Sequence, residues 1–163
     1  MTTRRHMLLG AAASAAALCA ATFNRRATAA TESFEISYTD AQWRARLSPQ
    51  QYAVLRQEAT ESPGSSPLNK EHRPGIFSCA GCSLPLFAST TKFESGTGWP
   101  SFWKPLDNAV ATRKDRSYGM VRIEAHCRRC GGHLGHVFED GPPPTGLRYC
   151  MNGLALTFTP KPA

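Results

Sequence analysis

Two pairs of cysteines have the spacing of a metal site in this chain of 163 residues. Cys79 and Cys82 form one Cys-x-x-Cys unit, and Cys127 and Cys130 form a second. A two-residue spacer lets one turn present both sulfurs to the same ion, and four thiolates meet the tetrahedral preference of Zn²⁺. The pairs predict a closed, structural zinc site. Two disulfides or a redox-active Cys-x-x-Cys are the alternatives, although the sequence lacks the strand and helix pattern of thioredoxin-like folds.

Cys150 is the remaining cysteine beyond residue 30. Side chains on a strand alternate between two faces, so Arg148, Cys150 and Asn152 are expected on the same face. A guanidinium favours the thiolate and lowers the pKa of a nearby thiol, and an amide can hydrogen-bond a polar group beside it. The pattern predicts a nucleophilic thiolate with a lowered pKa. A buried cysteine that packs as a small apolar side chain is the alternative.

Two histidines, His133 and His136, follow shortly after the second cysteine pair. Imidazole is the side chain best suited to donate a proton near neutral pH, so both are candidate proton donors in a reaction at Cys150. Metal ligands and purely structural histidines are the other interpretations.

Aromatic residues gather in the Gly/Pro-rich segment 96–103. Aromatic side chains on loops are typical of binding surfaces, and sulfur groups pack well on aromatic rings. We expect Trp99 or Trp103 to face a ligand, whereas Phe102 is expected to pack in the core.

Two short helices are expected between residues 39 and 60 to support these segments. Asp40 is the expected N-cap of the first helix. Ser48 is expected to open the second, because Pro49 then takes the first helical position and Gln51 completes a capping box.

Beyond these helices the apolar periodicity changes to two, which is typical of half-buried strands. Strands are expected at residues 75–79, 121–126, 135–138, 147–152 and 154–159. In the second of these, Val121, Ile123 and Ala125 are expected to face the core. No helix-length segment separates the strands, so the sequence predicts a mainly β fold of antiparallel sheets with small N-terminal helices.

Residues 1–30 have the order of an export signal. Arg4 and Arg5 precede an apolar, alanine-rich stretch over residues 7–21, and small residues end the segment. The stretch is shorter than the ~20 apolar residues of a membrane-spanning helix. The segment resembles a twin-arginine signal, which predicts export to the periplasm and loss of Cys19 with the signal. A mitochondrial presequence, and hence an organellar location, is the alternative.

The remaining residues, 31–163, are expected to form a single domain. The chain has 19 Lys and Arg against 12 Asp and Glu, but four arginines precede residue 31, which leaves 15 against 12. A net charge of about +3 without a long basic run argues against a nucleic-acid partner. No stable membrane insertion is expected after removal of the signal.

Five segments resemble the motifs of the peptide-methionine (R)-S-oxide reductase family, the methionine sulfoxide reductases of type B. They are Cys79-Ala80-Gly81-Cys82, residues 95–102 (SGTGWPSF), Cys127 with Cys130, residues 133–141 (HLGHVFEDG) and residues 146–152 (GLRYCMN). The resemblance extends from about Phe34 to Phe158. It implies reduction of methionine-R-sulfoxide, mainly in oxidised proteins or peptides, to methionine, which repairs oxidative damage.

The resemblance also implies a fold and a set of roles. The fold would consist of two antiparallel sheets, β-tent-like, around a shallow site, with structural zinc on the four paired cysteines. Cys150 would take the sulfoxide oxygen and become a sulfenic acid, Trp99 would receive the substrate methyl group, and Arg148 would favour the thiolate. The polar side of the site would be formed by His133, His136 and Asn152.

One position departs from the family pattern, because many members carry a resolving cysteine where this chain has Thr97. The sulfenic acid on Cys150 would then be reduced directly by an external thiol, either a thioredoxin-like protein or a small thiol, through a mixed disulfide. We expect a monomer. Two rival functions are a zinc-ribbon interaction module without catalysis and a zinc-stabilised enzyme that acts on another small thiol or sulfoxide.

Overall fold

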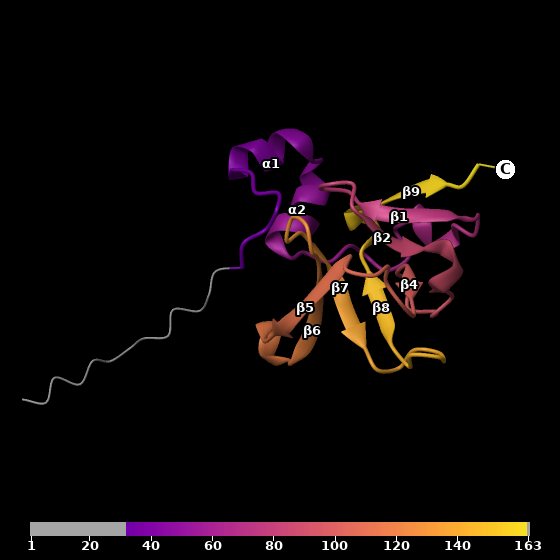
Figure 1. The fold of residues 1–163 in the computed structure, drawn as a ribbon. Helices are drawn as coiled ribbons and strands as arrows, with labels where there is room; N and C mark the ends of the chain where they lie inside the picture. Colours follow the sequence, from indigo (N-terminus) through magenta and orange to yellow (C-terminus); the bar gives the residue numbers. More distant parts are fainter. Residues whose placement is uncertain (1–31, 163) are drawn as a thin grey trace, which may run out of the picture. The chain divides into compact units, whose positions relative to one another are not determined.

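The computed structural model of the chain describes residues 32–162 (Figure 1). The predicted export signal at residues 1–30, which includes Cys19, lies outside the described residues. Within residues 32–162, no helix combines the length and the apolar character needed to cross a membrane.

Two short α-helices open the described part of the chain, as predicted. α1 spans Asp40–Arg46 and α2 spans Pro49–Gln57. α2 begins with the predicted capping box, in which the Ser48 hydroxyl accepts from the backbone N–H of Gln51 at 3.1 Å. The Gln51 side chain in turn accepts from the backbone N–H of Ser48 at 3.1 Å. Two donors that the helix itself leaves unpaired are thereby satisfied.

The N-cap of α1 is Thr39, so the prediction of Asp40 is wrong. The Thr39 hydroxyl accepts from the backbone N–H of Gln42 at 3.3 Å, and the Gln42 side chain accepts from the Thr39 N–H at 2.9 Å. Asp40 occupies the first helical position instead, where its carboxylate accepts hydrogen bonds from Arg44 and Tyr52. Thr and Asp both cap helices well, so sequence order alone does not separate two adjacent candidates.

The nine strands of the described residues form two antiparallel sheets, which confirms the predicted fold class. The smaller sheet has the order β2-β1-β9, with β1 at Gly75–Cys79, β2 at Pro85–Ala88 and β9 at Leu156–Pro160. The larger sheet has the order β3-β4-β8-β7-β6-β5. Its strands are β3 (Lys92–Phe93), β4 (Ser101–Phe102), β5 (Val110–Asp115), β6 (Arg122–Cys127), β7 (His133–Phe138) and β8 (Arg148–Met151).

Strand β1 coincides with the predicted strand at residues 75–79, and β6 to β9 overlap the other four predictions. The sequence did not predict β2 to β5, because these strands are short or polar. Short 3₁₀ helices within the described residues complete the fold: η1 (Pro67–Lys70), η2 (Ser89–Thr91), η3 (Ser117–Gly119) and η4 (Gly153–Ala155).

The predicted facing of β6 is wrong for two of its three apolar residues. Ala125 is buried, but Val121 is 68% exposed and Ile123 is 37% exposed. The opposite set of side chains, which includes Glu124 and His126, is buried instead. The alternation of the strand is present, but its inward face carries polar groups that have partners inside the protein. Hydropathy alone therefore predicts the wrong face.

Three phenylalanines, one from each of β1, β2 and β4, join the two sheets. The ring centroids of Phe77 and Phe102 lie 5.0 Å apart, and those of Phe87 and Phe102 lie 4.3 Å apart in a stacked arrangement. All three side chains are fully buried, as expected for Phe102. Phe102 is also the register partner of Tyr149 in β8, so this aromatic cluster fixes the strand that carries Cys150.

Candidate active site

Cys150 lies on β8 between two strands that present polar side chains beside it. Its register partner on β7 is His136, and its register partner on β4 is Ser101. Directly opposed residues of antiparallel strands project from the same face of the sheet with Cβ atoms about 5 Å apart. The sheet therefore places an imidazole on one side of the thiol and a hydroxyl on the other.

Gly135 permits the close approach of β7 to the Cys150 strand. It has a φ of +156°, and a Cβ atom at this position would lie 2.1 Å from the backbone oxygen of Cys150. Such a contact is far shorter than a van der Waals separation, so a side chain here would push the two strands apart. The glycine between the two histidines is thus required by the geometry around Cys150.

A cleft of about 150 Å³ opens over Cys150 and is lined mainly by apolar surface. Three other residues predicted for the site, Trp99, His136 and Asn152, line the same cleft. Phe138 and Arg122, which the sequence did not single out, complete its walls. The structure therefore brings four of the six residues predicted for catalysis or substrate binding to one opening.

Burial raises the pKa of the Cys150 thiol above its ordinary value. Hydrogen bonding from Thr97, the charge of Arg148 and hydrogen bonding from Ser101 act in the opposite direction, but they do not outweigh the burial. The prediction of a lowered pKa is therefore wrong for the protein without substrate. A buried anion loses its hydration, and one nearby cation only partly replaces it.

Thr97 stands next to the catalytic candidate. Its Oγ1 atom lies 3.9 Å from the Cys150 sulfur, within hydrogen-bond distance for sulfur. A chain of hydroxyls continues from it, with Ser95 Oγ 2.8 Å from Thr97 Oγ1 and 2.7 Å from Ser101 Oγ. The side of the sulfur where a resolving cysteine was considered is thus occupied by hydroxyl groups.

Arg148 is held in place by Asp140 through two parallel hydrogen bonds. Its Nε atom donates to Oδ1 at 2.8 Å and its Nη2 atom donates to Oδ2 at 2.9 Å. The guanidinium also lies over the Phe138 ring, 4.4 Å from its centroid. A bidentate pair fixes the orientation of the cation, and from this place its charge favours the thiolate of Cys150, as predicted in direction.

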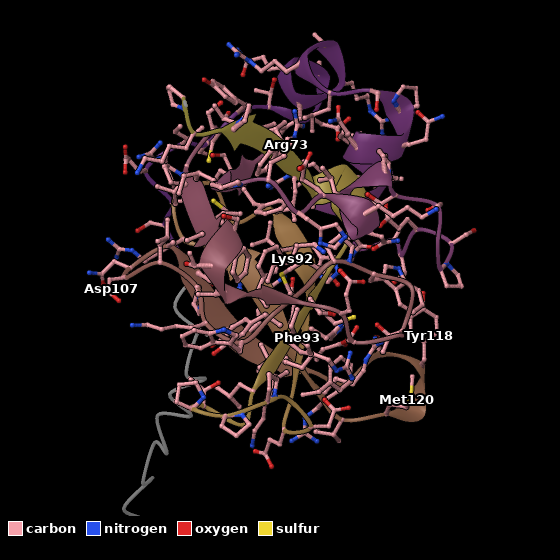
Figure 2. All side chains as sticks on the ribbon, turned by 90° about the vertical axis from the view of Figure 1, so that its right-hand side faces the viewer. Arg73, Lys92, Phe93, Asp107, Tyr118 and Met120 are labelled. Carbon is pink, nitrogen blue, oxygen red and sulfur yellow. The ribbon has the colours of Figure 1, made fainter. Side chains whose placement is uncertain are left out.

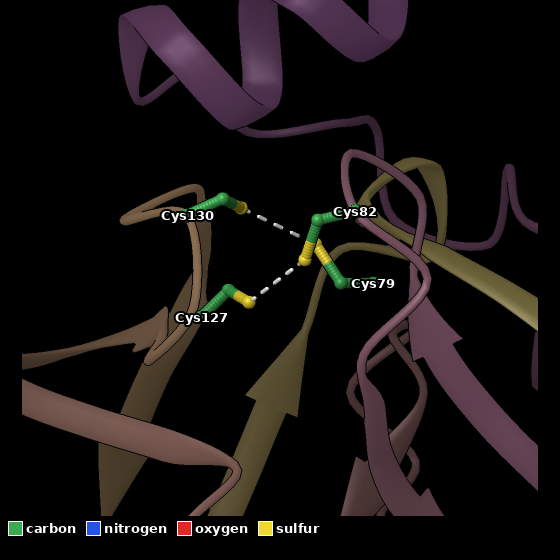
Figure 3. A group of neighbouring side chains, drawn as sticks. All are labelled: Cys79, Cys82, Cys127 and Cys130. Atoms are coloured by element: carbon green, nitrogen blue, oxygen red, sulfur yellow. Dashed lines mark hydrogen bonds between the residues drawn. The ribbon is translucent and has the colours of Figure 1, made fainter. Parts of the chain in front are cut away.

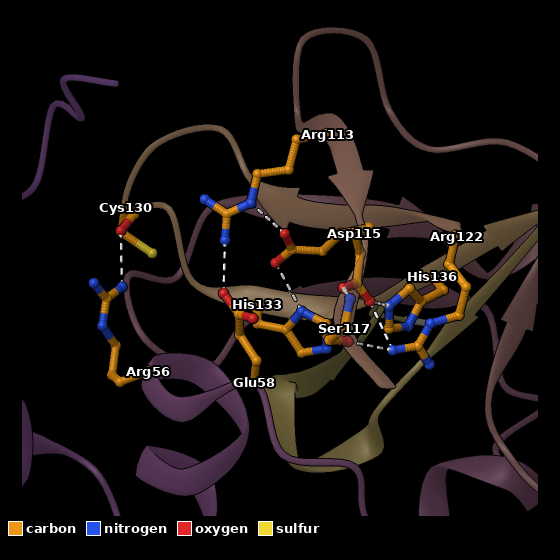
Figure 4. A network of polar contacts seen from close by, with 10 residues as sticks. Arg56, Glu58, Arg113, Asp115, Ser117, Arg122, Cys130, His133 and His136 are labelled. Atoms are coloured by element: carbon orange, nitrogen blue, oxygen red, sulfur yellow. Dashed lines mark hydrogen bonds and ion pairs between the residues drawn. The ribbon is translucent and has the colours of Figure 1, made fainter. Parts of the chain in front are cut away.

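His136 is supported from behind by a carboxylate (Figure 4). Its Nε2 atom lies 2.8 Å from Oδ2 of Asp115, which also accepts from Arg122 at 2.6 Å. Hydrogen bonds from Ser117, His136 and Arg122 hold the pKa of Asp115 well below its usual range. Burial lowers the pKa of His136 although the bond to Asp115 raises it. The imidazole is therefore neutral at pH 7, with its proton on Nε2, which donates it in a hydrogen bond to the Asp115 carboxylate.

His133 does not line the Cys150 cleft but an adjoining cavity of about 110 Å³, which His136 also lines. Its Nδ1 atom lies 2.8 Å from Oε1 of Glu124, and the two imidazole rings are 5.3 Å apart. Glu124 is 3% exposed; burial alone would raise its pKa, but hydrogen bonds from His133 and Arg113 lower it. His133 thus contacts His136 rather than the Cys150 sulfur. Of the two predicted proton donors, only His136 lines the Cys150 cleft.

Trp99 and Asn152 are linked through the main chain of Glu61. The indole Nε1 donates to the Glu61 carbonyl at 3.1 Å, and the Glu61 N–H donates to Oδ1 of Asn152 at 3.0 Å. The Glu61 carboxylate accepts from the backbone N–H groups of Gly153 and Leu154 at 2.6 and 3.0 Å. One buried residue therefore fixes both cleft residues and the chain that follows β8.

The amide of Asn152 is already engaged with the backbone on both sides, because its Nδ2 atom also donates to the Leu134 carbonyl at 3.2 Å. It is 3% exposed. These two bonds fix the orientation of the amide, and the expectation that it also bonds a polar group beside the sulfur stays a prediction. Asn152 lines the cleft chiefly as a fixed part of its wall.

The four paired cysteines form one cluster, as predicted (Figure 3). Their sulfur atoms all lie within 4.8 Å of one another, with 3.8 Å between Cys79 and Cys130 and 3.5 Å between Cys82 and Cys127. A tetrahedral ion with bonds of ~2.3 Å separates its sulfur ligands by about 3.8 Å, whereas a disulfide needs ~2.05 Å. All five cysteines in the described residues are free thiols, so the cluster fits a metal ion rather than the two disulfides considered from sequence.

The cluster joins the two sheets, because Cys79 ends β1 and Cys127 ends β6. Cys79, Cys127 and Cys130 are buried, whereas Cys82, in the turn after β1, is half-buried. The metal-binding group is separate from the Cys150 cleft and shares no residue with it. A metal ion bound by the cluster would therefore cross-link the two sheets.

Sequence reasoning missed the residues that hold the site together, namely Glu61, Arg113, Asp115, Arg122, Glu124 and Asp140. All are charged residues of ordinary types at positions with no recognisable spacing to Cys150. Only their burial or their pairing in the folded chain distinguishes them. Asp140 lies within a segment that carried the family resemblance, so that segment was the one available signal.

Comparison with known proteins agrees with this arrangement. A family model described as the SelR domain matches residues 47–160. A relative from Thiobacillus denitrificans, named peptide methionine sulfoxide reductase MsrB, is 57% identical over 124 residues, which cover 76% of this chain and 94% of the relative. Relatives of the same name from Agrobacterium fabrum and Bradyrhizobium diazoefficiens are 50% and 55% identical and cover 77% and 76% of this chain, and 94% and 89% of their own lengths. The chain therefore belongs to the SelR domain family, the family of the type B methionine sulfoxide reductases.

Proposed function

We propose that this chain reduces methionine-R-sulfoxide in oxidised proteins and peptides to methionine, with Cys150 as the nucleophile. The observation that carries the proposal is the shared cleft of Cys150, His136 and Trp99. It occurs in a chain whose relatives, at 50 to 57% identity, are named peptide methionine sulfoxide reductases.

The first step transfers the sulfoxide oxygen from one sulfur to another. The Cys150 sulfur attacks the substrate sulfur, and the oxygen takes a proton. The resulting hydroxyl then leaves the substrate sulfur with formation of a sulfenic acid on Cys150 and a thioether on the substrate. Two electrons move from the cysteine sulfur to the methionine sulfur, and the proton of the thiol ends on the transferred oxygen, so no further reactant is needed.

His136 is suited to carry that proton. The pKa of Cys150 is raised and the pKa of His136 is lowered, so both groups are neutral in the resting cleft. Proton transfer from the thiol to the imidazole creates the thiolate and an imidazolium side by side. Asp115 accepts a hydrogen bond from the imidazolium and Arg148 faces the thiolate, which stabilises the two charges that develop.

Selectivity for the R epimer follows if three substituents of the sulfoxide sulfur have fixed places. The methyl group packs on the indole of Trp99, the oxygen faces His136, and the substrate chain leaves through the mouth of the cleft. The side of the sulfur opposite its S–O bond, where a nucleophile attacks, then faces Cys150 in one epimer only. Because Glu61 fixes the indole, the methyl site is rigid.

Cys150 is regenerated by an external thiol in this proposal. No other cysteine lies beside it within the described residues: Thr97 is its neighbour, and the other four form the metal cluster. A first external thiol displaces water from the sulfenic acid to give a mixed disulfide, and a second releases the Cys150 thiol and an external disulfide. A thioredoxin-like protein and a small thiol both have the required chemistry.

Zinc is the ion that the cysteine cluster fits best. Four thiolates at tetrahedral spacing form a site closed to further ligands, so the metal supplies folding free energy and takes no part in the oxygen transfer. We also propose that residues 1–30 direct export to the periplasm and that the mature enzyme is a monomer. The order of arginines, apolar stretch and small residues supports export, and N-terminal sequencing of protein recovered from the periplasm tests it.

A turnover assay with separated epimers tests the function. With dithiothreitol as the reductant, the wild type should reduce the R epimer of N-acetyl-methionine sulfoxide and leave the S epimer unchanged. Cys150→Ser should abolish turnover, and His136→Gln should lower kcat by about 10²-fold or more. Turnover that survives in the Cys150→Ser variant would contradict the assignment of the nucleophile, whereas equal rates on both epimers would contradict the selectivity.

A further inference from the structure

Exposed apolar side chains gather at one place on the described part of the molecule. The large hydrophobic residues that are exposed are Tyr118 (87%), Met120 (50%), Val121 (68%) and Ile123 (37%). All four lie within the connection between β5 and β6 or at the start of β6, a segment from 117 to 123 that we call the apolar turn. Figure 2 shows Tyr118 and Met120 close together at one edge of the molecule. Single exposed apolar residues are ordinary, but such a cluster marks an interaction site.

The apolar turn is continuous with the Cys150 cleft. Tyr118 and Ser117 line the small cavity into which His133 and His136 face. Arg122, which lies between Val121 and Ile123 in the chain, lines both this cavity and the cleft over Cys150. A ligand that extends from the cleft past Arg122 therefore reaches Tyr118, the most exposed of the four apolar side chains.

Hydrogen bonds fix the base of the apolar turn (Figure 4). Asp115 accepts from the backbone N–H of Ser117 at 2.8 Å, and Arg122 donates to Asp115 at 2.6 Å and to the Ser117 hydroxyl at 3.1 Å. The same Asp115 carboxylate supports His136. The polar network of the active site thus holds the backbone of the turn, while its apolar side chains are exposed to solvent. Because this backbone is already fixed, a ligand that binds here loses little free energy to ordering the turn.

We propose that the apolar turn binds the polypeptide segment next to the oxidised methionine of an unfolded protein substrate. This inference rests on the proposed function and names the class of substrate that the site prefers. The cleft of about 150 Å³ is smaller than the ~300–1,000 Å³ of pockets that enclose drug-sized ligands, so it has room for the sulfoxide side chain while its neighbours stay outside. Methionines that folded proteins bury have apolar neighbours, and unfolding exposes both together.

Positive charges beside the apolar turn indicate a second property of the bound polypeptide segment. Lys114 and Arg116 are exposed next to the turn. They favour a segment that carries acidic residues beyond its apolar part. Apolar and basic side chains together also occur on surfaces that bind anionic lipid. The apolar turn adjoins the catalytic cleft, which favours the polypeptide as the ligand. A polypeptide substrate occupies both places at once, whereas binding to a lipid surface does not require the turn to adjoin Cys150.

A comparison of two substrates tests the proposal on the full chain, with dithiothreitol as the reductant. One substrate is N-acetyl-methionine-R-sulfoxide, and the other is oxidised casein, an unfolded protein. The double substitution Met120→Gln with Val121→Thr replaces apolar by polar side chains of similar size. It should lower kcat/KM for oxidised casein about tenfold, through a higher KM. Turnover of the small substrate should stay at the wild-type value, because neither residue lines the cleft.

Val110→Thr is a matched control at the other end of the same hairpin. It makes the same chemical change as Val121→Thr, but Val110 is partly buried against the core. The control should lower the melting temperature more than Val121→Thr and leave the ratio of kcat/KM values for the two substrates unchanged.

Three outcomes would overturn the proposal. An equal loss on both substrates would show that the turn only supports the active site. Unchanged turnover on both, together with lost binding to vesicles of phosphatidylglycerol, would show that the turn binds lipid instead. Unchanged turnover on both without such a loss would leave the turn with no role in substrate binding. Absence of wild-type activity on the small substrate would instead refute the proposed function itself.

Discussion

His136 on β7 and Cys150 on β8 are directly opposed residues of neighbouring antiparallel strands. The backbone of the larger sheet therefore sets the relation between imidazole and thiol, and no loop intervenes. Burial acts on the two groups in opposite directions, because it lowers the pKa of the imidazole and raises the pKa of the thiol. Both groups are therefore neutral near pH 7.

The pH dependence of alkylation tests the state of the thiol. The thiolate is the reactive form, so the rate of Cys150 alkylation by iodoacetamide should rise with pH to a plateau. The midpoint should lie above the ordinary thiol value of ~8.5, because burial raises the pKa. Arg148→Gln should move the midpoint to higher pH, since the charge of Arg148 favours the thiolate. A wild-type midpoint below 7 would contradict the dominance of burial.

The stability of the protein should decrease on acidification through His136. Its folded pKa is lowered, so the neutral form contributes stability that is present above the unfolded value of ~6.5 and is lost as the pH falls through the folded pKa. The difference in free energy of unfolding between wild type and His136→Gln should therefore fall between pH 7.5 and 5.5, by at most about 1.4 kcal/mol per pH unit. Urea titrations at several pH values measure it, and a difference that stays constant would rule out the lowered pKa. Titrating groups that do not interact with His136 cancel in the comparison, and Asp115, which does interact, titrates well below this pH range.

Introduction of a thiol beside Cys150 tests the regeneration step. Thr97→Cys places a sulfur near the present Oγ1 position, 3.9 Å from the Cys150 sulfur. After one equivalent of substrate, the variant should contain an intramolecular disulfide, whereas the wild type should give a sulfenic acid that dimedone traps on Cys150. Mass spectrometry of non-reduced peptides distinguishes the two. Thr97→Ser keeps the hydroxyl and should behave as the wild type, and a disulfide in the wild type would contradict the need for an external thiol.

Removal of one metal ligand should unfold the protein, whereas removal of the nucleophile should not. Cys79→Ser should lose zinc and the cooperative thermal transition, because the cluster joins the two sheets and metal binding is coupled to folding. Cys150→Ser is the matched control and should keep one zinc per chain and the wild-type melting temperature within a few degrees. Metal analysis by mass spectrometry and circular dichroism measure both. A folded, active Cys79→Ser variant would show that the cluster needs no metal.

Glu61 should affect substrate binding as well as stability. Both carboxylate oxygens accept backbone N–H groups, so Glu61→Gln turns one acceptor into a donor and should cost about 1–3 kcal/mol. Because the main chain of Glu61 holds Trp99 and Asn152, KM for the small sulfoxide should rise more than kcat falls. Glu94→Gln, at an exposed site on β3's flank, is the control. A loss of stability with an unchanged KM would show that Glu61 supports the fold but not substrate binding.

The sequence predicted the parts of this molecule that depend on residue type and short spacing. The cysteine pairs, the Ser48 capping box and the strand at residues 75–79 are local patterns, and each is present in the structure. Cys150 and His136 came from the same kind of reasoning, whereas the choice of Trp99 over Trp103 came from the family resemblance. All three line one cleft.

The parts that depend on tertiary partners could not be predicted. The inward face of β6 is polar because Glu124 finds His133 and Arg113, which no window of β6 itself reveals. The pKa of Cys150 depends on its burial, and burial is not visible in the neighbouring Arg148 and Asn152. Glu61 holds Trp99 and Asn152 through its main chain and residues 153 and 154 through its carboxylate, and the sequence around Glu61 does not reveal these distant partners.

The burial of the cysteine cluster has a consequence for how this protein withstands oxidants. Three of its four sulfurs are shielded, and Cys82 in the turn after β1 is the one that solvent can reach. Thiolates are the first targets of peroxides and hypochlorite. In the proposed cycle the oxidised form of Cys150 is reduced again, whereas oxidation of Cys82 would weaken the link between the two sheets. The working lifetime of this protein under severe oxidation should therefore be set by a sulfur that takes no part in repair.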